Sequence, residues 1–153
     1  MLHGQLIGIY LAPRKSKELL PFEKVEAVPG RGLVGDRYFL KEGGKHKPSR
    51  EVTLIEAEAL EALADDYQIT LQPAQSRRNL LTRGVSLNHL VGKMFTIGAV
   101  TLRGILLCEP CGHLESLTEK GVKAGLIHRG GLRAQLLVGG MLEVGVAITV
   151  PVG

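Results

Sequence analysis

The sequence predicts a mostly β fold, a compact and largely antiparallel barrel-like or sandwich-like sheet with a few short helices. Short apolar segments rich in Val, Ile and Leu recur along the chain, and 20 glycines and 7 prolines separate them. Strand-like and helix-like segments do not alternate regularly, which a parallel α/β sheet would require. A chain of 153 residues has the length of one domain, so we expect a single domain over residues 1–153.

Six segments have the composition of strands. They are apolar or alternate between apolar and polar residues, and most are bounded by glycine or proline: 4–11, 22–28, 93–97, 100–107, 132–138 and 141–150. Gly98-Ala99 and Gly139-Gly140 each separate two such segments by two residues. Because glycine adopts the positive φ that a tight turn needs, we expect both pairs to form hairpins.

The clearest helix signal begins at Thr53. Thr53 and Glu56 have the spacing of a capping box, and an apolar stripe follows at Ile55, Ala59, Leu60 and Leu63. Two shorter helices are expected. One begins at Leu87 with Ser86 as its cap, and the other runs from Gly112 through Leu114 and Leu117 to end at Gly121.

Composition and charge exclude several classes of protein. The apolar fraction is 44% and the net charge is only +4, which is not the profile of a disordered chain. The most basic segment, Lys41 to Arg50, is diluted by glycines, so we interpret it as a solvated loop and expect no nucleic-acid partner. Neither a dinucleotide-binding G-x-G-x-x-G motif nor a P-loop motif occurs.

Two cysteines spaced C-x-x-C cannot form the framework of a secreted disulfide-rich protein. The first apolar segment is followed, rather than preceded, by basic residues, which is the wrong order for a signal peptide. The apolar C-terminal stretch is divided by Gly139-Gly140 into two pieces too short to span a bilayer. We therefore expect a cytoplasmic protein without a membrane partner.

The strongest chemical signal is Cys108-Glu109-Pro110-Cys111-Gly112-His113, between a predicted strand and a predicted helix. Free backbone N–H groups at a helix start stabilise a thiolate, and Cys111 is the nearer of the two cysteines to that start. Three other interpretations stay open: two small buried residues, a dithiol redox pair, and a zinc site that also uses His113 and His128.

Two further clusters suit anion recognition. Arg77, Arg78, Asn79 and Arg83 form a run of planar donors for a carboxylate, a phosphate or an oxyanion. In the second cluster, glycines between basic side chains would let the backbone approach a bound anion; its members are His128, Arg129, Gly130, Gly131 and Arg133. Each cluster has an alternative interpretation as an exposed basic loop. A glycine-rich segment that contains Asp36 and Arg37 is a weaker signal.

In this order, the motifs resemble those of the MOSC domain family, named after the C-terminal part of molybdenum cofactor sulfurases. The resemblance covers nearly the whole chain, through G-x-x-G-D-R at 32–37, R-R-N-L at 77–80, F-x-I-G at 95–98, C-E-P-C at 108–111 and H-R-G-G-L-R-A at 128–134. Family members commonly have Gly-Asp in the last hairpin, where this sequence has Gly145-Val146.

The resemblance implies a β-barrel-like fold that binds molybdenum cofactor or carries sulfur for it. The family cysteine aligns with Cys111, which would ligate molybdenum or carry the transferable sulfur, with Cys108, His113, Asp36 and Arg37 in accessory roles. The anionic cofactor, a pterin with a dithiolene and a phosphate, would contact the basic residues of the two clusters.

The resemblance also implies a reaction and its partners. If Cys111 ligates the metal, the resemblance implies two-electron reduction of N-hydroxylated compounds, as in stand-alone bacterial relatives, and the partner would then be an electron donor. If Cys111 instead carries sulfur, the partner would be a cysteine desulfurase. Sulfurases of the family include a pyridoxal-phosphate-dependent desulfurase region, for which 153 residues leave no room. A metal-free dithiol oxidoreductase and a non-enzymatic zinc-binding or anion-binding module remain the alternatives.

Overall fold

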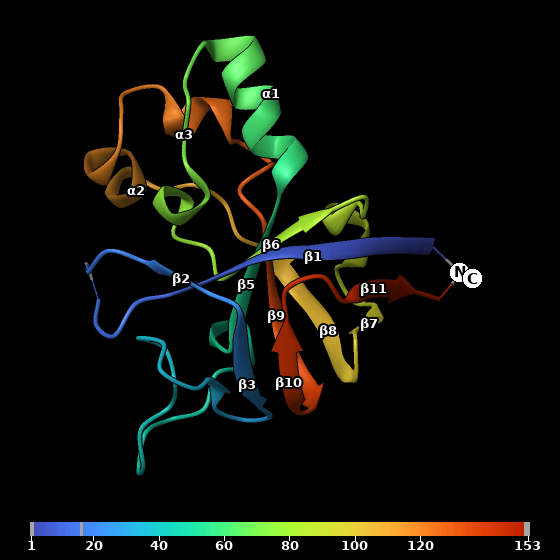
Figure 1. Ribbon diagram of the computed structural model, residues 1–153. Coiled ribbons are helices and arrows are strands. Elements are labelled where there is room, and N and C mark those ends of the chain that lie inside the picture. Colours follow the sequence, from blue (N-terminus) through green and yellow to red (C-terminus); the bar gives the residue numbers. More distant parts are fainter. Residues whose placement is uncertain (1, 16, 152–153) are drawn as a thin grey trace.

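The computed structural model describes residues 2–15 and 17–151, and its fold is mostly β, as predicted (Figure 1). Seven strands close into a barrel in the order β1-β11-β7-β8-β9-β5-β6, and β6 pairs with β1 again. Their bounds are β1 (Leu2–Leu11), β5 (Val52–Glu56), β6 (Leu80–Arg83), β7 (Met94–Ile97), β8 (Val100–Leu107), β9 (Leu132–Val138) and β11 (Ala147–Val150).

The barrel closes because β1 is long enough to pair with three strands. Its first residues pair with β11, its middle with β6, and its end with the short strand β2 (Leu20–Phe22). All strand pairs of the barrel are antiparallel except β5 and β6. Aliphatic side chains and Phe95 fill the interior, and Leu6, Leu54, Leu102 and Ile148 have no exposed surface.

A smaller antiparallel sheet packs beside the barrel. It contains β3 (Lys24–Val28), β4 (Gly32–Leu33) and β10 (Gly140–Glu143), in the order β10-β3-β4. Figure 1 shows this sheet at the lower end of the view, next to the long cyan segment that leads to β5. The buried side chains of β3 and β10 belong to the same apolar cluster as the barrel interior.

The helices gather at the opposite end of the molecule (Figure 1). Within the described residues they are α1 (Ala57–Tyr67), α2 (Gly112–Leu117) and α3 (Val122–Gly125), with single 3₁₀ turns η1 (Pro48–Arg50), η2 (Pro73–Ser76) and η3 (Leu87–Leu90). A second apolar cluster joins the three helices to the outer side of β5 and β6. None of the described helices is both long and apolar enough to cross a membrane.

One expectation about a connection is wrong, and one expected strand is shorter than predicted. Gly139-Gly140 does not close a hairpin, because β10 leaves the barrel to pair with β3 while β9 pairs with β8 and β5. The strand expected at 22–28 is present over Lys24–Val28 as β3, whereas Phe22 ends β2 on the barrel sheet. Pairing between strands that are distant in sequence decided both cases, and local turn signals cannot detect it.

The helix predicted from Thr53 begins later. Residues 52–56 form β5, the helix starts at Ala57, and Glu56 is its N-cap without a side-chain capping bond. Thr53 instead bonds to Asn79 on the neighbouring chain segment. The helix expected to end at Gly121 is also divided, because α2 stops at Leu117 and α3 begins at Val122.

One close approach of backbone to backbone fixes the turn before β9. Gly131 has a φ of +115°, and a Cβ built there would overlap the carbonyl oxygen of Leu54. Gly35 has a φ of +91° but no atom within 4 Å of such a Cβ. Comparing the two glycines therefore separates backbone strain from collision.

We expect Gly131→Ala to lower the free energy of unfolding by about 2–4 kcal/mol, because it adds a collision to an unfavourable φ. Gly35→Ala, which changes φ preference alone, should cost about 1 kcal/mol. Urea unfolding followed by circular dichroism measures both. Equal losses in the two variants would show that the contact with Leu54 does not matter.

Candidate functional site

The two cysteines differ in exposure. Cys108 follows the end of β8 and is 2% exposed, whereas Cys111 is the exposed N-cap residue of α2. Both are free thiols. The loop between them begins at the barrel wall, where the backbone N–H of Cys108 donates to the carbonyl of Gly131 at 2.7 Å. Cys111 is therefore the thiol that a ligand can reach.

The guanidinium of Arg78 holds this loop in place. Its Nε donates to the carbonyl of Gly130 at 2.7 Å, and its Nη2 donates to the carbonyl of Cys108 at 3.1 Å and, less closely, to that of Glu109 at 3.5 Å. Burial lowers the pKa of Arg78, and the neighbouring Cys108 thiol acts in the opposite direction. A single side chain thus joins the C-E-P-C loop to the 128–131 turn.

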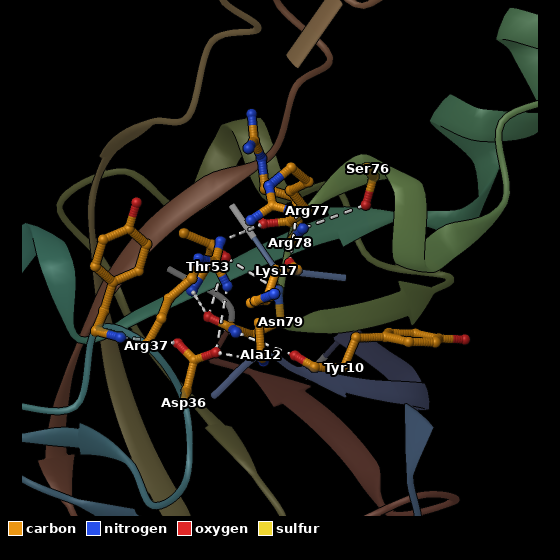
Figure 2. Close-up of polar contacts among 11 residues, drawn as sticks. Tyr10, Ala12, Lys17, Asp36, Arg37, Thr53, Ser76, Arg77, Arg78 and Asn79 are labelled. Carbon is orange, nitrogen blue, oxygen red and sulfur yellow. Dashed lines mark hydrogen bonds and ion pairs between the residues drawn. The ribbon is translucent and has the colours of Figure 1, made fainter. Parts of the chain in front are cut away.

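Arg78 points to this loop because of how the chain enters β6. Arg77 ends η2 in the left-handed region, with a φ of +62°. Asn79 is 1% exposed: its side chain accepts from Thr53 through Oδ1 and donates to the carbonyl of Tyr10 through Nδ2 (Figure 2). Asn79 therefore ties together the start of β6, β5 and β1.

The Asp36-Arg37 pair supports the same segment from the other side. Asp36 is buried, and its Oδ1 accepts from the backbone N–H of Ala12 and from Arg37 Nη1, at 3.1 and 3.2 Å. Arg37 Nη2 donates to the carbonyl of Arg77 at 3.0 Å (Figure 2). Arg77 itself donates through Nη1 to the carbonyl of Lys17. This network fixes the backbone from which Arg78 extends.

The 128–131 turn is bonded to the C-E-P-C loop. Glu109 accepts from the backbone N–H of His128 at 2.7 Å and lies 2.8 Å from its Nδ1. A Cβ on Gly130 would collide with the carbonyl of Cys108 and with Pro110. Gly130 and Gly131 therefore allow the turn to approach other backbone segments of this chain closely, and this contact explains both glycines.

The remaining predicted residues are dispersed. Arg83 is exposed at the far end of β6 and pairs with Glu61 of α1 through two N–O contacts of 3.1 and 3.3 Å. Arg133, on β9, donates to the carbonyl of Ser49 at 3.3 Å and acts on Arg78 as a neighbouring charge. His113 and Arg129 are exposed, and Arg129 lines a cavity on the α1 side of the turn.

The segment from Lys41 to Arg50 is more than the solvated loop that its composition suggests. It forms one wall of a cavity of about 430 Å³, together with residues 13–15, 30–31 and 37–40. The lining includes eight lysine or arginine side chains: Arg14, Lys15, Arg31, Arg37, Lys41, Lys45, Lys47 and Arg50. Residues distant in sequence build this cavity, so no local motif indicates it.

Glu51 lies at this cavity and is a residue that the sequence did not single out. It is 2% exposed; its Oε1 accepts from the backbone N–H groups of Gly30 and Leu136, and its Oε2 lies 2.7 Å from His46 Nε2. These bonds join the smaller sheet, the barrel and the cavity wall. A lone glutamate after a short basic segment gives no signal of such a role.

Among the residues that the structure describes, no three His, Cys, Asp or Glu side chains are grouped so that they could hold a metal ion. The zinc site considered from sequence, with Cys108, Cys111, His113 and His128, is therefore not supported.

We expect Arg78→Lys to lower the free energy of unfolding by about 2–4 kcal/mol. The ammonium group of lysine cannot reproduce the planar guanidinium whose Nε and Nη2 donate to the carbonyls of Gly130 and Cys108. Arg83→Lys, which changes an exposed ion pair, should cost less than about 1 kcal/mol. Urea unfolding measures both losses.

Labelling with a thiol reagent adds a local readout for the same pair of variants. Cys108 should react faster in Arg78→Lys than in the unchanged protein, because its loop is no longer held. Unchanged protection of Cys108 would contradict the role given to Arg78.

Comparisons with known proteins agree with this architecture. A model of the MOSC domain family matches residues 41–149. YuaD from Bacillus subtilis has a similar solved structure, with a TM-score of 0.79 and 17% identity over 96% of this chain and 94% of that one. The solved structure of YiiM from Geobacillus stearothermophilus is also similar, with a TM-score of 0.74 and 13% identity over 97% of this chain and 75% of that one. A search of curated proteins found no significant match.

YiiM from Escherichia coli also has this fold, with a TM-score of 0.68 and 15% identity over 100% of this chain and 71% of that one. These identities are low, so the solved structures support the fold alone. The family match covers most of the chain and contains the C-E-P-C loop, Arg78 and the 128–131 turn. This chain therefore belongs to the MOSC domain family.

Proposed function

We propose that this protein binds molybdenum cofactor and uses the Cys111 thiolate at its reactive centre, either as a ligand to molybdenum or as a carrier of transferable sulfur. The observation that carries the proposal is the exposed Cys111 on a loop that the partly buried Arg78 holds in place, while Arg37 of a strongly basic cavity bonds to the preceding residue, Arg77. MOSC domains are typically related to this cofactor, and the family match supports the same assignment.

The donor set fits the cofactor better than it fits a free metal ion. The dithiolene of the pterin supplies sulfur ligands, so the protein needs to contribute only one soft donor, and a thiolate is suited to that role. The described residues offer one exposed thiol and no cluster of three metal-ligating side chains. A zinc ion would require three or four protein ligands.

The charge of the site also fits the cofactor. The basic cavity has eight cationic side chains and one acidic one, Glu51, which is bonded within the protein. Its volume of about 430 Å³ lies in the range of small-molecule sites. A phosphate is the group that such a lining recognises best, because guanidinium and ammonium donors form charge-assisted hydrogen bonds with it.

Contacts connect this cavity to the Cys111 loop. Arg37 lines the cavity and donates to the carbonyl of Arg77, and the next residue, Arg78, bonds to the loop. Arg78 Nη1 has no hydrogen bond within the described residues, so it is available to an anion. In this proposal, Cys111 holds the metal end, Arg78 fixes the loop, and the cavity holds the phosphate end.

When bound, the cofactor supplies a metal centre capable of two-electron chemistry. If Cys111 ligates molybdenum, the reaction that fits is reduction of a small N-hydroxylated compound. Two electrons and two protons cleave the N–O bond and release water, and the electrons come from a separate electron-donor partner. If Cys111 carries sulfur, the product is a sulfurated cofactor and the donor is a cysteine desulfurase.

We expect Cys111→Ser to abolish cofactor retention, because it removes the only exposed thiol in the described residues. The Cys108→Ser protein should retain more cofactor than the Cys111→Ser protein. Cys108 is buried, and it contacts Arg78 through its backbone carbonyl rather than through its thiol. Molybdenum and zinc analysis, with pterin fluorescence after oxidative release, measures retention in protein from a host that makes the cofactor.

Equal tolerance of both substitutions would contradict the role of Cys111. Absence of molybdenum and pterin even after incubation with cofactor would overturn the proposal. A reversible Cys108–Cys111 disulfide with insulin-reducing activity in the metal-free protein, lost in both serine variants, would then favour the dithiol oxidoreductase.

We expect the double variant Lys47→Gln, Arg50→Gln to weaken cofactor retention by about tenfold or more, because two phosphate donors are removed from the cavity wall. The loss should shrink as salt is raised, since salt screens these charges. The matched control, Lys120→Gln with Lys123→Gln, removes the same charge at exposed positions outside the cavity lining. Pterin fluorescence after gel filtration at increasing salt measures retention, and equal loss in both double variants would exclude the cavity as the phosphate site.

A further inference from the structure

A second cavity, of about 340 Å³, lies on the other side of the 128–131 turn. It is bounded by the first turns of α1, by η3 with its cap Ser86, and by His128, Arg129 and Gly131. None of the residues of the basic cavity contributes to it. Its charged and titratable lining residues are Glu56, Glu58, His89, His128 and Arg129.

Two carboxylates are held in this cavity by backbone hydrogen bonds, and one oxygen of each has no hydrogen-bond partner in the described residues. Glu56 Oε2 accepts from the backbone N–H of Leu87 at 2.9 Å, and Glu58 Oε2 accepts from that of Gly84 at 2.8 Å. Glu58 Oε1 is buried without a hydrogen-bond partner in the described residues. Glu56 Oε1 also lacks a partner there. Buried acceptors without partners are rare in proteins and call for a donor.

The same cavity is lined by a cationic side chain, Arg129, that has no ion-pair partner in the described residues. The guanidinium of Arg129 forms no ion pair or hydrogen bond within the described residues, although it lines the same cavity as the carboxylates. Its charge nevertheless acts on Glu56: burial raises the pKa of Glu56, Glu58 adds to this effect, and Arg129 opposes it. Opposite charges thus face one cavity without joining in an ion pair.

We propose that this cavity binds a free α-amino acid as its zwitterion. The ammonium group would donate to Glu58 Oε1 and Glu56 Oε1, and the carboxylate would accept from Arg129. A simple cation would leave Arg129 without a partner, and a simple anion would leave the two glutamates without a donor. A ligand that carries an ammonium and a carboxylate on the same carbon can pair with both kinds of group, and its side chain would lie toward Ala59, Ala62 and His89.

This site is distinct from the proposed cofactor site, but the 128–131 turn that lines it is bonded to the Cys111 loop. Gly131 lines the second cavity, and its carbonyl accepts from the backbone N–H of Cys108. His128, on the same turn, is bonded to Glu109 between the two cysteines. An amino acid bound here therefore contacts the turn that packs against the Cys111 loop, without needing the cofactor.

Isothermal titration calorimetry with each common α-amino acid in turn tests the proposal. At least one should bind with a dissociation constant of about 1 mM or lower. For that amino acid, the amine that lacks the carboxylate and the N-acetyl derivative should each bind at least about tenfold more weakly, since each loses one charge. Absence of saturable binding, or equal binding of either analogue, would overturn the proposal.

Matched variants locate the binding. Glu58→Gln and Arg129→Gln should each weaken it by about tenfold or more, whereas Glu61→Gln, on the exposed face of α1 and outside the cavity lining, should leave it unchanged. Circular dichroism verifies that each variant is folded. Unchanged affinity in both cavity variants would contradict the assignment.

The measurement is repeated on Cys111→Ser protein. Retained amino-acid binding there, without cofactor, separates this proposal from the proposed function, so that either can fail alone. Loss of binding in Cys111→Ser would contradict the independence of the two sites.

Discussion

The fork of hydrogen bonds from Arg78 is the interaction on which the candidate site depends. It reaches the carbonyls of Gly130 and Cys108, which belong to two loops that meet only in the folded protein. Such a side chain must be held rigidly, and the Asp36-Arg37 and Thr53-Asn79 networks hold its backbone from both sides. The same constraint explains why Gly130 and Gly131 lack side chains, since the turn must approach Cys108 and Leu54 closely.

The charges of the molecule are divided around this centre. One cavity beside it is strongly basic, and the other combines two carboxylates with an unpaired guanidinium. The mild net charge of +4 hides this separation, because the average over the whole chain cancels the local concentrations. Local charge, rather than net charge, governs which small molecules a cavity attracts. The two cavities therefore suit ligands of different chemistry, and no lining residue is common to both.

Much of the fold could be predicted from local patterns. The sequence indicated the mostly β class, the strands at 93–97 and 100–107 with their hairpin, and the helix that follows Cys111. The predictions from sequence were wrong where pairing between strands distant in sequence overrides the local structural preference. Residues 52–56 have a capping-box pattern but become β5, because barrel strands lie on both sides of them. Gly139-Gly140 looks like a hairpin turn but leads into another sheet, because β3 offers a free edge.

For the candidate site, the sequence by itself determined the order of its motifs, the C-E-P-C pair and the residues of the two basic clusters. These are local properties, fixed by which residues are adjacent. Only the tertiary structure decided that Cys108 is buried while Cys111 is exposed, that Arg78 bonds to backbone, and that Arg83 and Arg129 lie elsewhere. Exposure and partnership depend on segments that are distant in sequence, as in the bond between Glu51 and Leu136, which are 85 residues apart. Closure of the barrel brings such segments together, and no pattern within one segment encodes that contact.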